Sequence, residues 1–324
     1  MTQDDKGLRP EEFGEAAEAA ITDALSRPAE AHAGVLAAAG LFGVCAPEDD
    51  GGMDLPLAFA VPVVQAGGRL RLRFALAEQI ALARHLPDAA LRAALADGSR
   101  RATIAVQGRL GDAWVGHARQ AQQSDWLLLR TAEGEGAVLV DLAGAPCQLD
   151  PALDPEEPAA WLDLSQATVL ARLDADAAAA LWQDLNLLLA ATAHGAADGA
   201  LLAAVEHTNT RVQFGAALST RQAVRHWLAR MKLFHEAGGA AIAHALRSDC
   251  AAQERTARSA LALNLRHAAF IIEKAMHLHG GMGFTWELPL HRALRTVRGL
   301  DAACGADALA RQLGQDFITA QEAA

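Results

Sequence analysis

The feature that most restricts the fold of this chain is the helical spacing of apolar residues in its C-terminal half. Val224, Trp227, Leu228 and Met231 follow positions i, i+3, i+4 and i+7, so they lie on one face of a helix. The same spacing predicts a second helix face from Leu261, Leu265, Ala268, Ala269 and Ile272. Such faces are stable only when they are buried against other elements. Residues from about 174 to the end are therefore predicted to form a helical bundle.

The N-terminal part, from about residue 10 to 98, is also predicted to be helical. Its alanine- and leucine-rich segments are Glu11–Ser26, Ala75–Leu86 and Asp88–Ala96. Each of these segments carries charges around one face. Pro87 separates the last two, because a proline ends or kinks a helix. Residues 40–55, which contain a proline and paired glycines, are predicted to form a loop between helices.

The middle of the chain changes to short runs of β-type residues separated by glycine. These runs are Thr103–Val106, Trp126–Leu129, Ala137–Val140 and Trp161–Leu170. They predict antiparallel strands joined by tight turns, and the proline-rich, acidic stretch Leu149–Pro158 is predicted to be a loop. Helices, then strands, then helices define an α+β fold that is mainly α.

Charge and cysteine usage exclude several classes of protein. The formal charge is −11 and no cluster of lysine and arginine stands out, so nucleic acid is not expected as a partner. The N-terminus is polar and acidic, unlike a signal peptide, and no uncharged apolar run is long enough to span a membrane. The cysteines are widely spaced with no CxxC pair, and they are Cys45, Cys147, Cys250 and Cys304. This spacing argues against a structural zinc site and fits a reduced, cytoplasmic protein.

Two segments carry residue types suited to a dinucleotide. In RVQFGAALSTRQAV, residues 211–224, Arg211 offers a planar fork of donors for a phosphate oxygen. Phe214 in the same segment offers an apolar face to an aromatic ring. In HLHGGMGFTWELPLHRALR, residues 277–295, three glycines form a turn whose backbone N–H groups can face a pyrophosphate.

Both segments resemble signatures of the acyl-CoA dehydrogenase family. These are an Arg-x-x-Phe-Gly segment followed by a Gln-Ala pair, and a Gly-Gly-x-Gly-Phe turn that ends in Pro-x-x-Arg-x-x-Arg. A weaker third match is Pro47-Glu48 followed by Gly51-Gly52. The resemblance implies an N-terminal helical domain at 1–98, a reduced middle β-domain at 99–173 and a C-terminal four-helix bundle at 174–324.

The resemblance also implies FAD as the cofactor and an acyl-CoA thioester as the substrate, which the family desaturates between its α and β carbons. It assigns the adenine and pyrophosphate end of FAD to Arg211, Gln213, Phe214, Arg221, Gln222, His277, His279, Gly280 and Gly281. In the family these residues reach FAD held mostly by a neighbouring subunit, so a dimer or tetramer is expected. The expected electron acceptor is an electron-transferring flavoprotein.

Simpler explanations exist for several of these residues. Arginines near helix starts often form surface ion pairs, and a glycine-rich turn is usually only a turn. His277, His279 and His291 match no strong zinc pattern, so local hydrogen bonds are expected and no metal site is predicted. Trp182, Trp227 and Phe234 are predicted to be core residues. The acids at positions 154, 156, 157 and 163 are predicted to form a solvated surface.

The chain departs from the family at the catalytic base. The family removes the α proton with a glutamate, which must be desolvated and poised beside a weakly acidic carbon. Counting from the Gln-x-x-Gly-Gly turn, which opens here with His277, places that position at Cys304. Some relatives carry the base on an earlier helix, and that count reaches Leu185, next to Asp184. The segments that wrap the flavin ring, Thr-Glu-Pro-x-x-Gly-Ser-Asp and Trp-Ile-Thr, are not found in the middle domain.

Three hypotheses remain open. In the first, the chain is one subunit of a heteromeric acyl-CoA dehydrogenase, and a homologous full-length subunit supplies the flavin ring pocket and the glutamate. The GFTWE segment resembles a branch of the family that contains unequal subunits and acts on lipid or steroid side-chain CoA esters. This hypothesis is preferred, because the missing β-domain segments count against a homo-oligomer and the intact FAD-contacting residues count against a scaffold. In the second, the chain is a homo-oligomeric oxidoreductase whose displaced base is Asp184. In the third, it is a non-catalytic helical scaffold without flavin.

Overall fold

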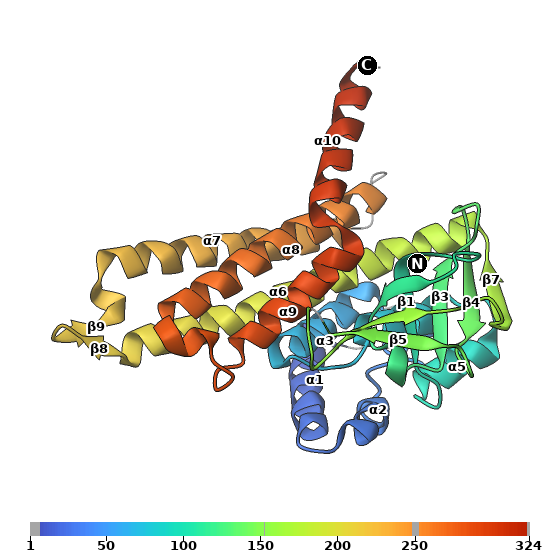
Figure 1. Cartoon of the computed structure of the whole chain (residues 1–324), viewed down its shortest axis with the longest axis horizontal. Helices are drawn as coiled ribbons and strands as arrows, with labels where there is room; N and C mark the ends of the chain where they lie inside the picture. The colour runs from blue at the N-terminus through green and yellow to red at the C-terminus, as the bar shows by residue number, and fades with distance from the viewer. Residues whose placement is uncertain (1–6, 152, 248–252, 323–324) are drawn as a thin grey trace.

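A computed structural model describes residues 7–151, 153–247 and 253–322. Helices at the N-terminus, a small β-region and a C-terminal group of long helices follow one another along the chain (Figure 1). This arrangement confirms the predicted α+β, mainly α fold. Cys250 lies outside the described residues.

The N-terminal region forms five helices, which are α1 (Pro10–Leu25), α2 (Ala29–Ala38), α3 (Leu57–Leu70), α4 (Leu76–His85) and α5 (Ala89–Ala96). Pro28 and Pro56 stand directly before α2 and α3, where the missing N–H of proline costs nothing. The carboxylate of Asp88 caps α5 by accepting a hydrogen bond from the N–H of Leu91 at 3.1 Å. Residues 40–55 form the predicted loop, with one short 3₁₀ turn at Glu48–Asp50.

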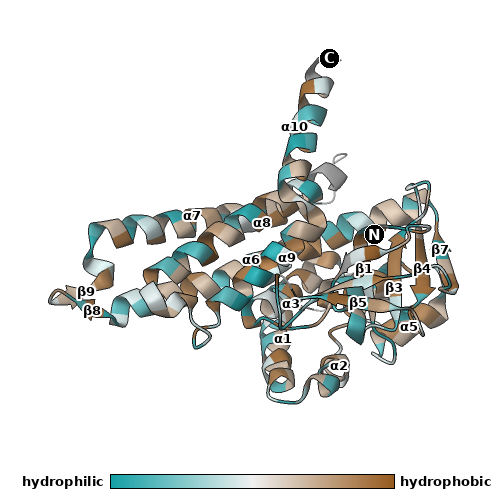
Figure 2. Ribbon diagram, in the orientation of Figure 1, coloured by the Kyte–Doolittle hydropathy of each residue, from teal (hydrophilic) through white to brown (hydrophobic). Residues whose placement is uncertain are grey.

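The β-region consists of two small sheets. Its strands are β1 (Ala102–Arg109), β2 (Val115–Ala118), β3 (Trp126–Arg130), β4 (Ala137–Asp141), β5 (Cys147–Asp150), β6 (Ala159–Leu162) and β7 (Val169–Leu173). One sheet has the order β1-β3-β4-β7 and the other has the order β2-β6-β5. Figure 2 shows β3 and β4 as strongly hydrophobic, which agrees with the burial of their central residues.

Three of the strand predictions were wrong in detail. β1 and β3 pair in parallel, because the chain between them leaves for the second sheet as β2 and returns in the same direction. The single strand predicted at Trp161–Leu170 is two strands, β6 and β7, which belong to different sheets. The predicted loop Leu149–Pro158 begins inside β5, so its first two residues are paired.

The C-terminal helices are α6 (Ala175–Thr210), α7 (Gln222–Ala245), α8 (Gln253–Leu278), α9 (Leu290–Cys304) and α10 (Ala306–Glu322). α7 and α8 are long, adjacent and antiparallel, and α6 and α9 complete a group of four helices (Figure 1). The chain breaks at Gly305, whose φ of 66° is left-handed, and α10 then projects away from the group. The terminal helical segment is therefore split into two.

Of the three aromatic residues predicted in the core, Trp182 is buried, with the guanidinium of Arg130 over its ring. Trp227 and Phe234 are half-buried, and both pack against Phe270. α6 is the one described helix that is long and apolar enough to cross a membrane. Most of its apolar stretch is buried between α3, α7, α8 and α9, as expected for the central helix of a bundle.

Glycines set the close approach of α3 to α6. A Cβ on Gly195 would lie 2.0 Å from the carbonyl oxygen of Gln65, and a Cβ on Gly68 would lie 2.0 Å from that of Thr192. Real side chains do not tolerate such distances, so the two helices pack backbone to backbone. This contact joins the N-terminal helices to the bundle.

We expect Gly195→Ala to destabilise the protein by about 1–3 kcal/mol or more, because an inserted methyl forces the two backbones apart. Gly34→Ala is the matched control, since Gly34 lies in α2 with open space around it, and it should stabilise by about 0.5–1 kcal/mol. Urea unfolding followed by circular dichroism measures both changes. Equal stability of Gly195→Ala and the wild type would show that α3 and α6 do not pack this closely.

Candidate functional site

A short β-hairpin with a two-residue turn follows the C-terminal end of α6. The chain leaves α6 at Arg211, and β8 (Val212–Gln213) pairs with β9 (Ala216–Ala217) in antiparallel fashion. Phe214 and Gly215 form the turn, with φ values of 52° and 76°. A phenylalanine in the left-handed region is strained, and its side chain is 92% exposed. The hairpin therefore holds an aromatic ring out into solvent.

Arg221 fixes the shape of this hairpin. Its Nη2 donates hydrogen bonds to the carbonyl oxygens of Gln213 and Phe214, both at 3.1 Å, and its guanidinium lies 5.8 Å from the Phe214 ring centre. Gln222, the next residue, is exposed at the start of α7. Arg221 thus has a local structural role, in addition to the FAD contact that the sequence predicts for it.

Arg211 has no comparable local role. Its side chain is exposed, and in the described part of the chain no hydrogen bond or ion pair joins its guanidinium to another residue. The alternative that Arg211 forms a surface ion pair therefore finds no support. Its donors are free to bind an anionic group.

The second predicted segment lies beside the first. α8 ends at Leu278, and the ring of His279 stacks on that of His207 near the end of α6, with centres 4.2 Å apart. Burial lowers the pKa of His207, and the nearby His279 and Arg211 lower it further. This stack brings the two sequence motifs together. His207 was not predicted, because a single histidine on a helix gives no sign of a partner seventy residues away.

The Gly280-Gly281 turn is open to solvent. Gly280 has a φ of 65°, and neither glycine has an atom within 4 Å of where a Cβ would stand. Gly283 differs, because its Cβ would lie 2.1 Å from the carbonyl oxygen of Met276, so it is required for packing. His277 is exposed beside the turn, while His279 bonds the carbonyl oxygen of Ala275 at 2.8 Å. In the described residues no three potential metal ligands come together.

Large apolar side chains are exposed on these two motifs and next to them. They are Val212 (61% exposed), Phe214, Met282 (52%), Phe284 (67%) and Trp286 (56%). Exposed aromatic side chains next to free donors are typical of a surface that a ligand or partner covers. We call the surface formed by residues 211–222 and 277–286 the FAD-end surface.

The two candidate base positions lie near the opposite end of α6. Cys304 ends α9 and lines a cavity of about 370 Å³ together with Trp182 and Asn186 of α6. Burial raises the pKa of its thiol to about 12, and Arg119 opposes this while Glu78 and Asp301 add to it. The sequence around Cys304 contains no cation, so the influence of Arg119 was not foreseen.

Asp184, the other candidate base, is held by two partners on α4. Its Oδ2 lies 2.8 Å from Nε2 of His85 and 3.4 Å from Nε of Arg84. Leu185, the family position itself, is fully buried. Asp184 therefore joins the N-terminal helices to α6 through one of its carboxylate oxygens.

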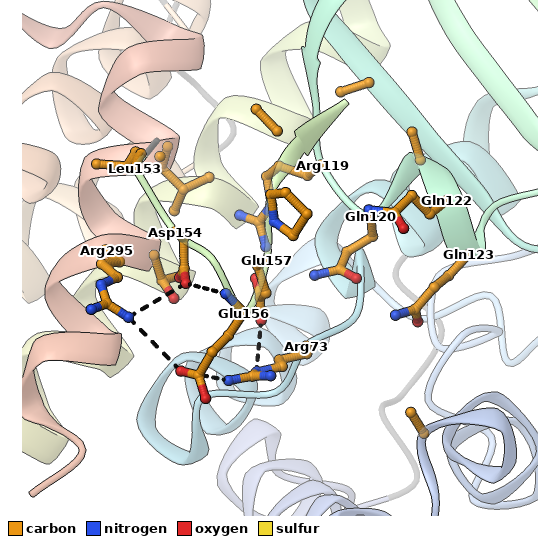
Figure 3. A pocket seen from close by; sticks show the side chains of 18 of the residues that line it. Arg73, Arg119, Gln120, Gln122, Gln123, Leu153, Asp154, Glu156, Glu157 and Arg295 are labelled. Carbon is orange, nitrogen blue, oxygen red and sulfur yellow. Dashed lines mark hydrogen bonds and ion pairs between the residues drawn. The ribbon is translucent and has the colours of Figure 1, made fainter. Parts of the chain in front are cut away.

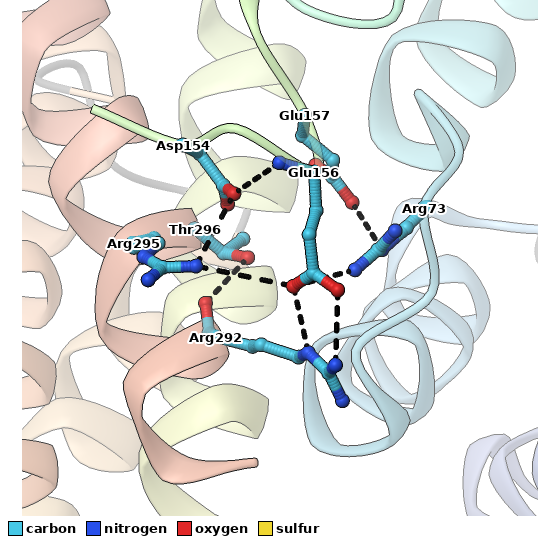
Figure 4. A network of polar contacts seen from close by, with 7 residues as sticks. All are labelled: Arg73, Asp154, Glu156, Glu157, Arg292, Arg295 and Thr296. Carbon is cyan, nitrogen blue, oxygen red and sulfur yellow. Dashed lines mark hydrogen bonds and ion pairs between the residues drawn. The ribbon is translucent and has the colours of Figure 1, made fainter. Parts of the chain in front are cut away.

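A third group of polar residues was predicted wrongly. Asp154, Glu156 and Glu157 were expected on a solvated surface, but they lie in contact with Arg73 from the α3–α4 turn and with Arg292 and Arg295 of α9 (Figure 4). They border a cavity of about 480 Å³ (Figure 3). The arginines are far away in sequence, so no local pattern reveals these contacts. Asp163 is solvated as predicted.

Comparison with known proteins agrees with this architecture. Residues 184–318 match the C-terminal domain of acyl-CoA dehydrogenases. The acyl-CoA dehydrogenase IpdE2 of Mycobacterium tuberculosis is 30% identical over 270 residues, covering 78% of this chain and 75% of that protein. The acyl-CoA dehydrogenase FadE34 of the same organism is 30% identical over 292 residues, which cover 83% of this chain. The chain spans only 39% of the length of FadE34.

A solved structure described as the Tcur3481-Tcur3483 steroid ACAD G363A variant is similar along almost the whole chain. The TM-score is 0.84 at 25% identity, and the match covers 97% of this chain and 99% of that one. The chain belongs to the acyl-CoA dehydrogenase family. The predicted family and fold class are confirmed, and the cofactor of this family is FAD.

The FAD-end surface offers a free guanidinium, an exposed aromatic ring and an open glycine turn. These are groups that could hold a pyrophosphate and an adenine ring.

We expect iodoacetamide at pH 8 to modify the exposed Cys147 and to spare Cys304 and Cys45, because burial raises their thiol pKa values to about 12 and about 11. A thiol whose pKa lies well above the pH holds little of the reactive thiolate. Peptide mass spectrometry measures each site, and all should react in urea. Modification of native Cys304 as fast as Cys147 would contradict the buried thiol.

Proposed function

We propose that this chain is a subunit of a heteromeric acyl-CoA dehydrogenase and that it completes the FAD site of a homologous full-length partner. The flavin, bound mainly by the partner, supplies hydride acceptance in the desaturation of an acyl-CoA thioester. This chain supplies Arg211, Gln213 and the Gly280-Gly281 turn for the pyrophosphate and Phe214 for the adenine ring. His207 and His279 hold the two motifs together.

The observation that carries this proposal is the exposure of the FAD-end surface. A ligand binds firmly when most of its surface is buried, but Phe214 is 92% exposed and Arg211 is free. The groups present thus form half a site, and a second chain has to supply the other half. A non-catalytic scaffold without flavin would have no reason to retain a strained phenylalanine beside a free arginine.

The length of α6 separates the FAD-end surface from the two candidate base positions. Leu185 and Arg211 are 26 residues apart on this helix, which corresponds to about 39 Å at 1.5 Å per residue. One dinucleotide cannot lie against the FAD-end surface and also place its flavin ring beside Cys304 of the same chain. This separation favours a site shared between two chains.

The residues at the base positions favour a non-catalytic role for this subunit. Cys304 holds its proton, and Asp184 is bound by His85 and Arg84. A homo-oligomer with Asp184 as the base would use a carboxylate that is already paired with Arg84 and His85. The glutamate that takes the α proton would therefore come from the partner.

The comparisons support a paired assembly and a substrate class. The similar steroid ACAD has a name that joins two components. By analogy we propose a CoA ester of a lipid or steroid side chain as the substrate, and an electron-transferring flavoprotein as the acceptor. Since the chain spans 39% of FadE34, a single longer protein can carry what two chains would carry here.

In the complex with its partner, Arg211→Ala should release FAD without unfolding the bundle. A charged hydrogen bond to phosphate contributes about 1.5–3 kcal/mol, so FAD affinity should fall by about tenfold to a hundredfold at 1.4 kcal/mol per decade. Flavin retention after gel filtration measures this. Arg311→Ala, on the exposed side of α10, is the control. Unchanged retention in Arg211→Ala would remove this residue from the site.

Cys304→Ala should leave turnover of the complex within a small factor of the wild type, because a thiol with a pKa of about 12 is not a base at neutral pH. Removal of a true general base lowers the rate by about 10²–10⁴-fold. Steady-state kinetics at matched FAD content distinguishes the two cases. A loss of that size with folding intact would make this chain a catalyst in its own right.

A further inference from the structure

The carboxylate of Glu156 is contacted by three arginine side chains (Figure 4). Arg292 forms a two-pronged contact with it, with Nε 2.7 Å from Oε2 and Nη2 2.9 Å from Oε1. Nη2 of Arg73 lies 3.0 Å from Oε2, and Nη1 of Arg295 lies 3.9 Å from the same atom. One negative charge thus faces three guanidinium groups, from the α3–α4 turn and from α9.

Two neighbouring acids share these arginines, so that three carboxylates face the three guanidinium groups. Asp154 lies 3.5 Å from Arg295, and Glu157 lies 3.2 Å from Arg73. Burial raises the pKa of Glu157, while Arg119 and Arg73 oppose this shift. Arg71 adds a further cation, which has no ion-pair partner among the described residues. Burial lowers the pKa of its guanidinium, and repulsion from Arg292 lowers it further.

Arg73, Glu156 and Arg295 line the cavity of about 480 Å³ (Figure 3). This cavity is large enough for a small organic molecule. Nη1 of Arg119 is buried there with no hydrogen-bond acceptor among the described residues, although Nε of the same side chain lies 3.4 Å from Glu78. Nη1 of Arg295 has only the longer ion-pair contacts with Asp154 and Glu156 given above. Gln120, Gln122 and Gln123 line another wall, and Gln120 has a strained φ of 53°. Buried donors without acceptors and strained backbone are features that binding sites share.

A guanidinium binds carboxylate and phosphate with the same fork of N–H groups. We propose that Arg73, Arg292 and Arg295 form a binding site for the phosphate group of an organic phosphate, and that Glu156 is the internal occupant that this phosphate displaces. The rest of the ligand would lie in the cavity against the glutamine amides. This site shares no residue with the FAD-end surface and does not depend on the proposed function.

The test is the affinity of the full chain for inorganic pyrophosphate, measured by calorimetry in wild type and in Glu156→Gln. The amide keeps the shape of the side chain and removes the competing charge. Glu156→Gln should therefore bind pyrophosphate at least about tenfold more tightly, a change of about 1.4 kcal/mol. Adding Arg292→Ala to Glu156→Gln should abolish the gain.

The matched control is Glu12→Gln, which removes a carboxylate from an exposed pair with Arg9 on α1. It should leave pyrophosphate affinity unchanged. An equal gain in this control would show a general effect of net charge and overturn the proposal. Equal affinity of wild type and Glu156→Gln would also overturn it.

If Glu156→Gln does not fold, hydrogen–deuterium exchange of the wild-type chain decides the matter. Saturating pyrophosphate should displace Glu156 and raise exchange at the backbone of residues 154–158 severalfold, with no such change for sodium chloride of the same ionic strength. Unchanged exchange would overturn the proposal.

Discussion

Burial of α6 is the constraint on which the rest of the structure depends. This helix contacts α3, α4, α7, α8 and α9, and at Gly68 and Gly195 its backbone touches that of α3 directly. Such contact leaves no freedom to shift one helix along the other. The N-terminal helices and the bundle are thereby fixed together, and both ends of α6 are held at set positions.

The two ends of α6 lie at different candidate sites, the base positions at one end and the FAD-end surface at the other. The N-terminal end lies beside Cys304 and holds Asp184 in an ion pair, where relatives place a base. The C-terminal end presents Arg211 and Phe214 to solvent and positions His207 against His279. Under the proposed function, the first end is structural and the second holds groups for an anionic, aromatic ligand. The proposal thereby assigns part of a cofactor site to this chain and the base to its partner.

The helices could be predicted from the sequence, because they depend on spacing within one segment. The two dinucleotide motifs also lie within single segments, and their role in binding FAD stays a prediction. Strand pairing could not, since the parallel pairing of β1 with β3 depends on a detour through a second sheet. The environment of Glu156 was hidden for the same reason, because Arg73 and Arg292 are 83 and 136 residues away. Arg119 near Cys304 is a further long-range contact that no local pattern shows.

The central claim is that this chain holds only one side of a FAD site, and flavin stoichiometry tests it most directly. The chain is purified alone and after co-expression with a full-length relative, and flavin absorbance is compared with protein concentration. The account predicts a nearly colourless lone chain and a yellow complex with about one FAD per pair of unequal chains, since half a site leaves too much of the ligand exposed. About one tightly bound FAD per protomer in the lone chain would contradict it.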